Sequence, residues 1–187
     1  MNAAHLEFCA SPDWRQMVEE LVLPAALADH DLGDDVIEIG PGPGFTTDVL
    51  RHRVERLTAV EIDTALADAL AERLAGTNVT VVRADASVLD LPDGRFSGGT
   101  SFNMLHHVPT ADLQDRIFAE LARVLRPGGL FVAADAAPRD ELDAFHEGDT
   151  YNPIDPEGLE GRLRRAGFTG VAIRDYDLGW VASAPAA

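Results

Sequence analysis

Residues 36–44 read Val36-Ile37-Glu38-Ile39-Gly40-Pro41-Gly42-Pro43-Gly44. A short apolar run ends here in three glycines that alternate with prolines, and a helical segment opens directly afterwards at Phe45. This order predicts a buried strand, a glycine-rich turn and a helix. Because glycine has no Cβ and the start of a helix has free N–H groups, we expect the turn to hold a ligand close to the backbone. The alternative is a tight strand-to-helix connection without a ligand.

Strand and helix patterns alternate along the rest of the chain. Apolar runs bounded by turn signals predict four more strands, at 57–62, 79–83, 98–103 and 130–134. Apolar residues at helical spacing lie between most of these runs, which predicts a mainly parallel sheet with helices on both faces. The last two apolar runs, 171–174 and 180–183, are separated by too few residues for a crossover. They should therefore pair antiparallel.

The length of 187 residues predicts a single domain that spans 1–187. Residues 1–33 are expected to form a helical flank, in which Ser11-Pro12 starts a helix that Pro24 interrupts. Residues 34–135 form the expected cofactor-binding core. Residues 136–187 are expected to hold a lid or substrate segment and the closing hairpin.

Charge and cysteine content limit the expected partners. The chain has 32 acidic and 15 basic side chains and a formal charge of −17. Such a surface repels phosphate backbones and anionic lipid headgroups, so we expect neither a nucleic-acid partner nor a membrane partner. No apolar run approaches the roughly 20 residues of a membrane span. The single Cys9 cannot pair within the chain, which favours a reducing compartment, and we expect a cytoplasmic location.

The glycine spacing and Glu38 indicate the charge of the ligand. The pattern G-x-G-x-G differs from the dinucleotide fingerprint G-x-G-x-x-G. A carboxylate at Glu38, two residues before the first glycine, would oppose a diphosphate but suit a ligand with an ammonium or sulfonium charge. The sequence therefore favours a cationic ligand over NAD.

Polar residues also follow the next three predicted strands. Glu61 stands about 20 residues beyond Gly40, where an acidic side chain can accept hydrogen bonds from ribose hydroxyls. Asp85 could accept a hydrogen bond from an exocyclic amine such as that of adenine, and Asn103 ends the fourth strand. Because the carboxyl ends of parallel strands meet at one edge of a sheet, these residues should converge on the glycine turn. A solvated charge at 61 and a turn aspartate at 85 are the alternatives.

Together these motifs resemble those of the class I S-adenosylmethionine-dependent methyltransferases. The matching stretches are residues 36–44, Val60-Glu61-Ile62-Asp63, Arg83-Ala84-Asp85-Ala86, Asn103-Met104-Leu105-His106-His107-Val108 and Leu125-Arg126-Pro127-Gly128-Gly129-Leu130. They occur in the family's order between about Asp34 and Val181. The resemblance implies a doubly wound, Rossmann-like α/β fold with seven strands in the order 3-2-1-4-5-7-6 and strand 7 antiparallel.

The resemblance also implies S-adenosylmethionine as cofactor and S-adenosylhomocysteine as product. The implied cofactor-binding residues are Glu38, Gly40, Gly42, Gly44, Glu61, Ile62, Asp85, Ala86 and Asn103. The glycines would approach the methionine part, with Glu38 at its ammonium group directly or through water. Glu61 would bind the ribose hydroxyls, while Ile62, Asp85 and Ala86 would contact adenine. Asn103 would lie beside the methionine and the sulfonium.

Methyl transfer from a sulfonium is an in-line displacement, in which the protein mainly aligns the acceptor. The resemblance is to enzymes with small-molecule acceptors. His106 is the candidate general base, and a structural role at the following helix is its alternative. Candidate acceptor contacts lie in the helical flank, after the fourth strand and in the segment 138–156, and they are Trp14, His107, His146 and Tyr151.

No metal is expected, because Asp135 and Asn103 do not complete a set of oxygen ligands for magnesium. Two other functions remain open. One is a non-catalytic module or sensor that binds S-adenosylmethionine. The other is a nicotinamide-dependent oxidoreductase, which the glycine spacing and Glu38 disfavour.

Overall fold

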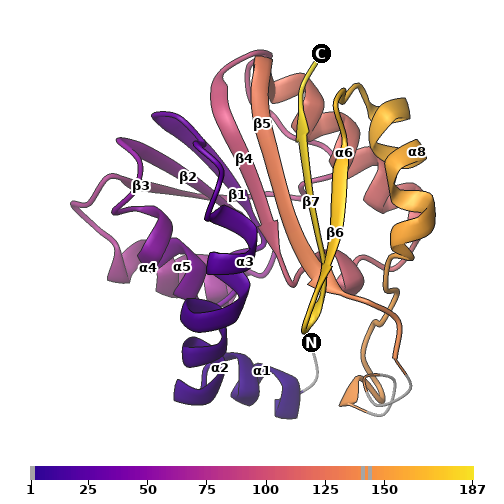
Figure 1. The fold of residues 1–187 in the computed structure, drawn as a ribbon. Coiled ribbons are helices and arrows are strands. Elements are labelled where there is room, and N and C mark those ends of the chain that lie inside the picture. The colour runs from indigo at the N-terminus through magenta and orange to yellow at the C-terminus, as the bar shows by residue number, and fades with distance from the viewer. Residues whose placement is uncertain (1–2, 140–141, 143–144) are drawn as a thin grey trace.

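The computed structural model describes residues 3–139, 142 and 145–187. These residues form a seven-stranded sheet in the order β3-β2-β1-β4-β5-β7-β6 (Figure 1). The strands are β1 (Asp35–Ile39), β2 (Arg56–Glu61), β3 (Val79–Arg83), β4 (Phe96–Phe102), β5 (Leu125–Ala136), β6 (Ala172–Tyr176) and β7 (Gly179–Pro185). β7 runs antiparallel to both β5 and β6, whereas the pairs among β1 to β5 are parallel. The predicted fold class and strand order are confirmed.

Helices precede the sheet and connect its strands. They are α1 (Ala3–Cys9), α2 (Pro12–Met17), α3 (Leu23–Leu27), α4 (Phe45–Leu50), α5 (Thr64–Arg73), α6 (Ala111–Val124) and α8 (Pro156–Ala166). A π-helical segment, η1 (Val18–Val22), joins α2 to α3, and a 3₁₀ turn, η2 (Leu105–His107), follows β4. In Figure 1, α1 and α2 lie at the end of the sheet where the chain leaves β5. No helix in the described part of the chain is long and apolar enough to span a membrane.

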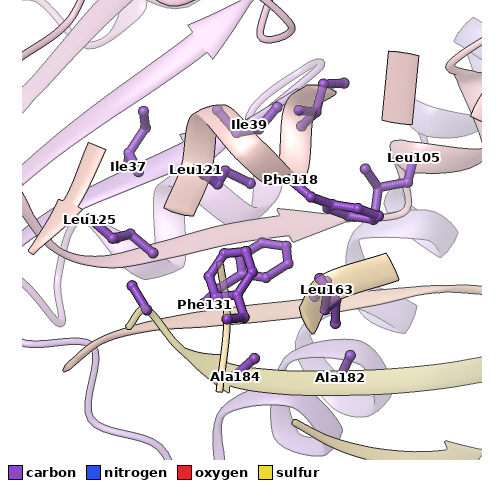
Figure 2. Packing of buried hydrophobic residues seen from close by; sticks show 14 of the residues in the cluster. Ile37, Ile39, Leu105, Phe118, Leu121, Leu125, Phe131, Leu163, Ala182 and Ala184 are labelled. Atoms are coloured by element: carbon purple, nitrogen blue, oxygen red, sulfur yellow. The ribbon is translucent and has the colours of Figure 1, made fainter. Parts of the chain in front are cut away.

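The strands are apolar on both faces of the sheet because helical segments cover both faces. Val36 of β1 and Val132 of β5 pack in one core with residues of η1 and α3. Ile37 and Phe131, their neighbours in sequence, point to the opposite face and pack in a second core with α6 and α8 (Figure 2). This two-sided burial explains why the strands are nearly continuous apolar runs.

The N-terminal flank differs from the prediction at Pro24. The predicted start is confirmed, since the Ser11 hydroxyl accepts a hydrogen bond from the N–H of Trp14 at 3.1 Å. The helical path does not stop at Pro24, however, because α3 continues through it. In η1 the N–H of Leu23 donates to the carbonyl of Val18, five residues back. This π-helical turn puts Pro24 in the first turn of α3, where a missing N–H costs little.

The segment between β5 and α8 contains the predicted lid. Four of its residues, Asp140, Glu141, Asp143 and Ala144, lie outside the described residues, as do Met1 and Asn2 of the flank. Further along, the backbone N–H of Asn152 donates to the carbonyl of His106 at 2.7 Å. The chain before α8 is therefore held against η2. The lid itself and the three-part division of the chain stay predictions.

Candidate active site

A cavity of about 780 Å³ opens at the carboxyl ends of the parallel strands. One part of its wall is formed by the glycine turn after β1, the ends of β2 and β4 and the turn after β3. The other part is formed by α1, α2, η1 and α6. The cavity lies where the strand order reverses between β1 and β4, the usual ligand position in open α/β sheets, and its size is typical of a ligand site.

Glu61, at the end of β2, joins the acidic motif to the glycine turn. The side chain is 6% exposed and lines the cavity. One carboxylate oxygen accepts a hydrogen bond from the N–H of Gly42 at 3.0 Å, and the other accepts one from the N–H of Asp63 at 2.9 Å. The two predicted motifs therefore meet, and each oxygen retains capacity to accept from a ligand hydroxyl.

The glycines of the turn are required for different reasons. Gly40 and Gly42 both have left-handed backbone angles, with φ of 68° and 54°. A Cβ on Gly40 would lie 2.1 Å from the Cγ of Met104, so a larger residue at 40 would clash with that side chain. A Cβ on Gly44 would clash in the same way with the side chain of Leu70. A Cβ on Gly42 would meet no atom of the described residues within 4 Å, and Gly42 lines the cavity. Gly42 thus leaves backbone open to a ligand.

Glu38 lies beneath the turn and does not line the cavity. It is 1% exposed, and its carboxylate accepts hydrogen bonds from the hydroxyls of Thr46 and Thr47, the latter at 2.6 Å. Burial raises the pKa of Glu38 to about 7, despite the two hydroxyl donors, which lower it. Thr46 lines the cavity and donates its hydroxyl to Glu38, so Thr46 lies between Glu38 and the cavity. A role at the ammonium group of the cofactor stays a prediction.

The remaining cofactor candidates, Ile62, Asp85, Ala86 and Asn103, all line the cavity. Ile62 is 67% exposed, which is unusual for an isoleucine and gives the cavity an apolar platform. Asp85 accepts a hydrogen bond from the N–H of Ser87 at 2.8 Å. This bond agrees with the turn-aspartate alternative and leaves the second carboxylate oxygen for a ligand.

Asn103 is the most unusual residue of the cavity wall. Its φ of 51° is the only left-handed value of a non-glycine residue in the described chain. Its side-chain Oδ1 is buried and has no hydrogen-bond partner among the described residues. Strained backbone and an unpaired buried acceptor both concentrate at functional sites, because a ligand can supply the missing donor.

His106, the predicted base, is buried behind the cavity wall. Its Nδ1 lies 2.5 Å from Oδ1 of Asp135, and its backbone N–H donates to Oδ2 of the same carboxylate at 3.2 Å. Burial lowers the pKa of His106, but the Asp135 carboxylate outweighs burial and holds that pKa above its ordinary value. His106 is not among the described residues that line the cavity, whereas His107 is. Burial, together with His106 and His5, lowers the pKa of His107 to about 3.

The four acceptor candidates separate into two pairs. Trp14 and His107 line the cavity. His146 and Tyr151 are outside the set of described residues that line it, and they stack on each other with ring centroids 4.3 Å apart. Sequence reasoning missed a group of apolar residues that line the cavity: Leu6, Cys9, Val18, Val22, Leu113 and Ile117. Leu113 and Ile117 of α6 follow a helical spacing in the sequence, which predicts a helix but does not show that its apolar side faces a cavity.

A model of the family described as "Methyltransferase domain" matches residues 37–133, more than half of the chain. The chain belongs to the class I S-adenosylmethionine-dependent methyltransferases. The match covers the glycine turn, Glu61 at the end of β2 and Asp85 in the turn after β3, which belong to the motifs from which the sequence predicted this family. S-adenosylmethionine is the cofactor of the family.

Two curated relatives illustrate the similarity. The Ribosomal RNA small subunit methyltransferase A of Pelotomaculum thermopropionicum is 36% identical over 102 residues, which are 50% of this chain and 34% of the relative. The Fatty-acid O-methyltransferase of Mycolicibacterium smegmatis is 32% identical over 132 residues, 70% of this chain and 47% of the relative. The chain thus spans about a third to a half of the length of these two relatives.

Two solved structures match this chain over nearly their full length. A chain from the complex between the Haloferax volcanii Trm112 methyltransferase activator and the putative methyltransferase has a TM-score of 0.76 and 17% identity, with 100% of this chain and 98% of that chain covered. An S-adenosylmethionine dependent methyltransferase from Mesorhizobium loti has a TM-score of 0.74 and 18% identity, with 90% and 99% covered. At these identities the likeness shows the fold.

The expectation that nucleic acid is not a partner was wrong. It is contradicted by the ribosomal RNA methyltransferases among the relatives, and the Trm112 complex adds a protein activator to the partners found in this group. The expectation rested on the net charge, which also counts buried carboxylates that a partner at the surface does not contact. Glu38 and Asp135 are each 1% exposed and Glu61 is 6% exposed. Net charge describes the whole chain and does not give the charge of the particular face that a partner meets.

Proposed function

We propose that the protein transfers the methyl group of S-adenosylmethionine to a small-molecule acceptor by in-line displacement. The observation that carries this proposal is the two-part wall of the cavity. One part holds the residues expected for the cofactor except Glu38 and Gly44, which are not among the described residues that line the cavity, and the other is an apolar wall from the N-terminal helices and α6. A single cavity thus offers space for both reactants, as displacement requires.

The residues present fit S-adenosylmethionine. The open backbone at Gly42 suits a chain that lies against it, and Oδ1 of Asn103 lacks a donor among the described residues. Glu61 would accept from the ribose hydroxyls, while Ile62 and Asp85 would hold the adenine ring. When bound, S-adenosylmethionine supplies the electrophilic methyl group.

The apolar wall supports an acceptor with a hydrocarbon part. Leu6, Trp14 and Ile117 come from three different helices and line the same cavity. Trp14 packs on Phe8 with ring centroids 5.6 Å apart, which fixes α1 against α2. Apolar side chains exclude water from the reacting groups and align the acceptor by contact. The similarity to the fatty-acid methyltransferase of M. smegmatis supports the same class of acceptor.

The test is formation of S-adenosylhomocysteine with a panel of carboxylic acids, phenols and amines, and with small-subunit ribosomal RNA as the competing acceptor. We expect turnover with an apolar small molecule. The Trp14→Ala variant should raise the KM of that acceptor by at least about tenfold, or 1.4 kcal/mol, and leave cofactor affinity nearly unchanged. Leu21→Ala, a change at an exposed apolar residue that is not among those lining the cavity, is the matched control.

Each other outcome overturns the proposal. Methylation of ribosomal RNA without turnover of any small molecule would assign a nucleic-acid acceptor. Tight cofactor binding without turnover of any acceptor, in the panel or in a cell extract, would assign a non-catalytic binding module.

A further inference from the structure

We propose that His5, His106, His107 and His146 form a binding site for one divalent transition-metal ion of the zinc class. Four of the six histidines of the chain meet here. They come from α1, from η2 and from the segment before α8. One ring nitrogen of each histidine lies within 4.8 Å of one ring nitrogen of every other.

The second ring nitrogen of each histidine faces an oxygen. Nδ1 of His106 is 2.5 Å from the Asp135 carboxylate, and Nδ1 of His146 is 2.6 Å from the carbonyl of Leu142. Nδ1 of His107 lies 3.4 Å from the carbonyl of Thr150, and Nδ1 of His5 lies 3.5 Å from the Asp149 carboxylate. Metal-binding histidines are held in this way, with the non-ligating N–H donated to a carboxylate or carbonyl. For His106, His107 and His146, whose Nδ1 atoms have hydrogen-bond partners, the pattern assigns Nε2 as the ligand atom.

Burial and charge favour a cation at the centre of this cluster. His5, His106 and His146 are each 5% exposed. Nε2 of His146 is buried without a hydrogen-bond partner in the described structure, which is costly unless a ligand pairs with it. Two buried carboxylates flank the cluster, since the side chains of Asp135 and Asp149 are 1% and 7% exposed. A divalent ion would balance both negative charges.

The donor set selects the class of metal. Imidazole nitrogen suits zinc, copper, nickel and iron, whereas magnesium and calcium take oxygen ligands. Tetrahedral zinc with Zn–N distances of about 2.0–2.1 Å needs ligand nitrogens about 3.4 Å apart. The four candidate nitrogens now lie up to 4.8 Å apart, so small side-chain rotations have to bring them closer together when the ion binds. The expectation of no metal rested on oxygen ligands for magnesium and did not include this all-histidine set.

The position of the cluster suggests what the ion does. His107 lines the cavity, and so do Leu6 and Cys9 of α1, the helix that carries His5. An ion bound to all four histidines would tie α1 to η2 and to the segment around His146, and so fix the apolar wall of the cavity. Four protein ligands make a closed site, which is typical of structural metal. His106 would then act as a ligand and a positioning residue rather than as a base.

The test uses the untagged full chain, freed of metal with a chelator. Titration with Zn²⁺ in a calorimeter should give one ion per chain with a Kd below about 1 µM, and the Tm should rise with Zn²⁺ but not with Mg²⁺. Co²⁺ should give the intense visible bands of a tetrahedral site. Absence of 1:1 binding, or binding of Mg²⁺ as tightly as Zn²⁺, would overturn the proposal.

Variants locate the ion. His5→Gln and His146→Gln should each weaken Zn²⁺ binding at least about 100-fold, and Asp135→Asn about 10–100-fold. His30→Gln and His52→Gln, at the two histidines outside the cluster, should bind as the wild type does. His5 lies in the short first helix, so its variant should keep the sheet folded, which circular dichroism will check. Equal binding by the cluster variants and the wild type would contradict the site.

Discussion

The carboxylate of Glu61 and the backbone N–H of Gly42, 19 residues apart in sequence, are joined by a hydrogen bond of 3.0 Å. This bond connects the end of β2 to the turn after β1. The second oxygen of Glu61 holds the N–H of Asp63, the residue that caps α5. One buried carboxylate therefore fixes two turns of the cavity wall before a ligand arrives, which lowers the entropy cost of binding.

Replacement of Glu61 by alanine should weaken binding of S-adenosylmethionine and S-adenosylhomocysteine about 10- to 150-fold. Hydrogen bonds to a charged group contribute about 1.5–3 kcal/mol, and the variant would lose those proposed to the ribose as well as the support of the turn. Isothermal titration calorimetry measures both affinities. Glu72→Ala, on the exposed side of α5, is the control and should bind normally. Unchanged affinity in Glu61→Ala would remove this residue from the cofactor site.

A pair of glycine variants separates backbone strain from ligand contact. Gly42 and Gly76 have φ of 54° and 77°, and a Cβ on either would meet no atom within 4 Å in the part of the chain that the structure describes. Alanine at either position should cost about 1–2 kcal/mol of unfolding free energy, because both must adopt the left-handed conformation. Only Gly42→Ala should also weaken cofactor binding, since only Gly42 lines the cavity. Equal affinities in the two variants would show that no ligand approaches the backbone at Gly42.

The parts of the site that the sequence predicted are those that follow a strand directly. Gly42, Glu61 and Asn103 each end a short apolar run, and parallel pairing alone brings such ends together. The part contributed by α1 was not predicted, because His5 and Leu6 belong to no motif and reach the site only through tertiary packing. The histidine cluster was not predicted, because His106, His107 and His146 were considered separately as a base and as acceptor contacts, and His5 joins them only through tertiary packing.

Local rules also failed where the backbone departs from regular geometry. Pro24 reads as a helix end, but the π-helical hydrogen bond from Leu23 to Val18 shifts the helical register just before it. The residue types of η1 do not predict this shift. The position of Glu38 shows a similar limit, since its place before the first glycine was evident but its hydroxyl partners on α4 were not.

The buried carboxyl of Glu38 should make stability depend on pH near neutrality. Its pKa is raised from 4.5 to about 7 by burial, so the folded state binds its proton more tightly than the unfolded state does. The resulting stabilisation is fully present below about pH 4.5 and is lost as pH rises through 7. Between pH 5.5 and 8.5 the free energy of unfolding should fall by about 2 kcal/mol relative to Glu38→Gln, which cannot ionise.

Urea unfolding of both proteins at several pH values measures this difference. Glu55→Gln is the matched control, because the side chain of Glu55 is 75% exposed and its charge is solvated in both states. Its stability should follow that of the wild type at every pH. A constant difference between wild type and Glu38→Gln from pH 5.5 to 8.5 would mean that Glu38 titrates at its ordinary pKa.

Gln114 of α6 holds the chain before α8 against the cavity wall. The side chain is 1% exposed, and its amide nitrogen donates to the carbonyls of Leu105 and Asn152, each at 2.9 Å. Its amide oxygen accepts from the guanidinium of Arg162, also at 2.9 Å. The side-chain amide of Gln114 therefore forms hydrogen bonds with three elements, which are η2, the segment around Asn152 and α8.

Replacement of Gln114 by leucine should lower the free energy of unfolding by about 1–3 kcal/mol, because it removes one donor from each of the two carbonyls and the acceptor of the Arg162 guanidinium. Detachment of the segment around Asn152 should also speed its cleavage by a protease under native conditions, before the sheet unfolds. Gln16→Leu, at an exposed glutamine of α2, should change stability by less than about 0.5 kcal/mol. Loss of global stability without faster local cleavage would mean that Gln114 supports the core and does not hold the segment.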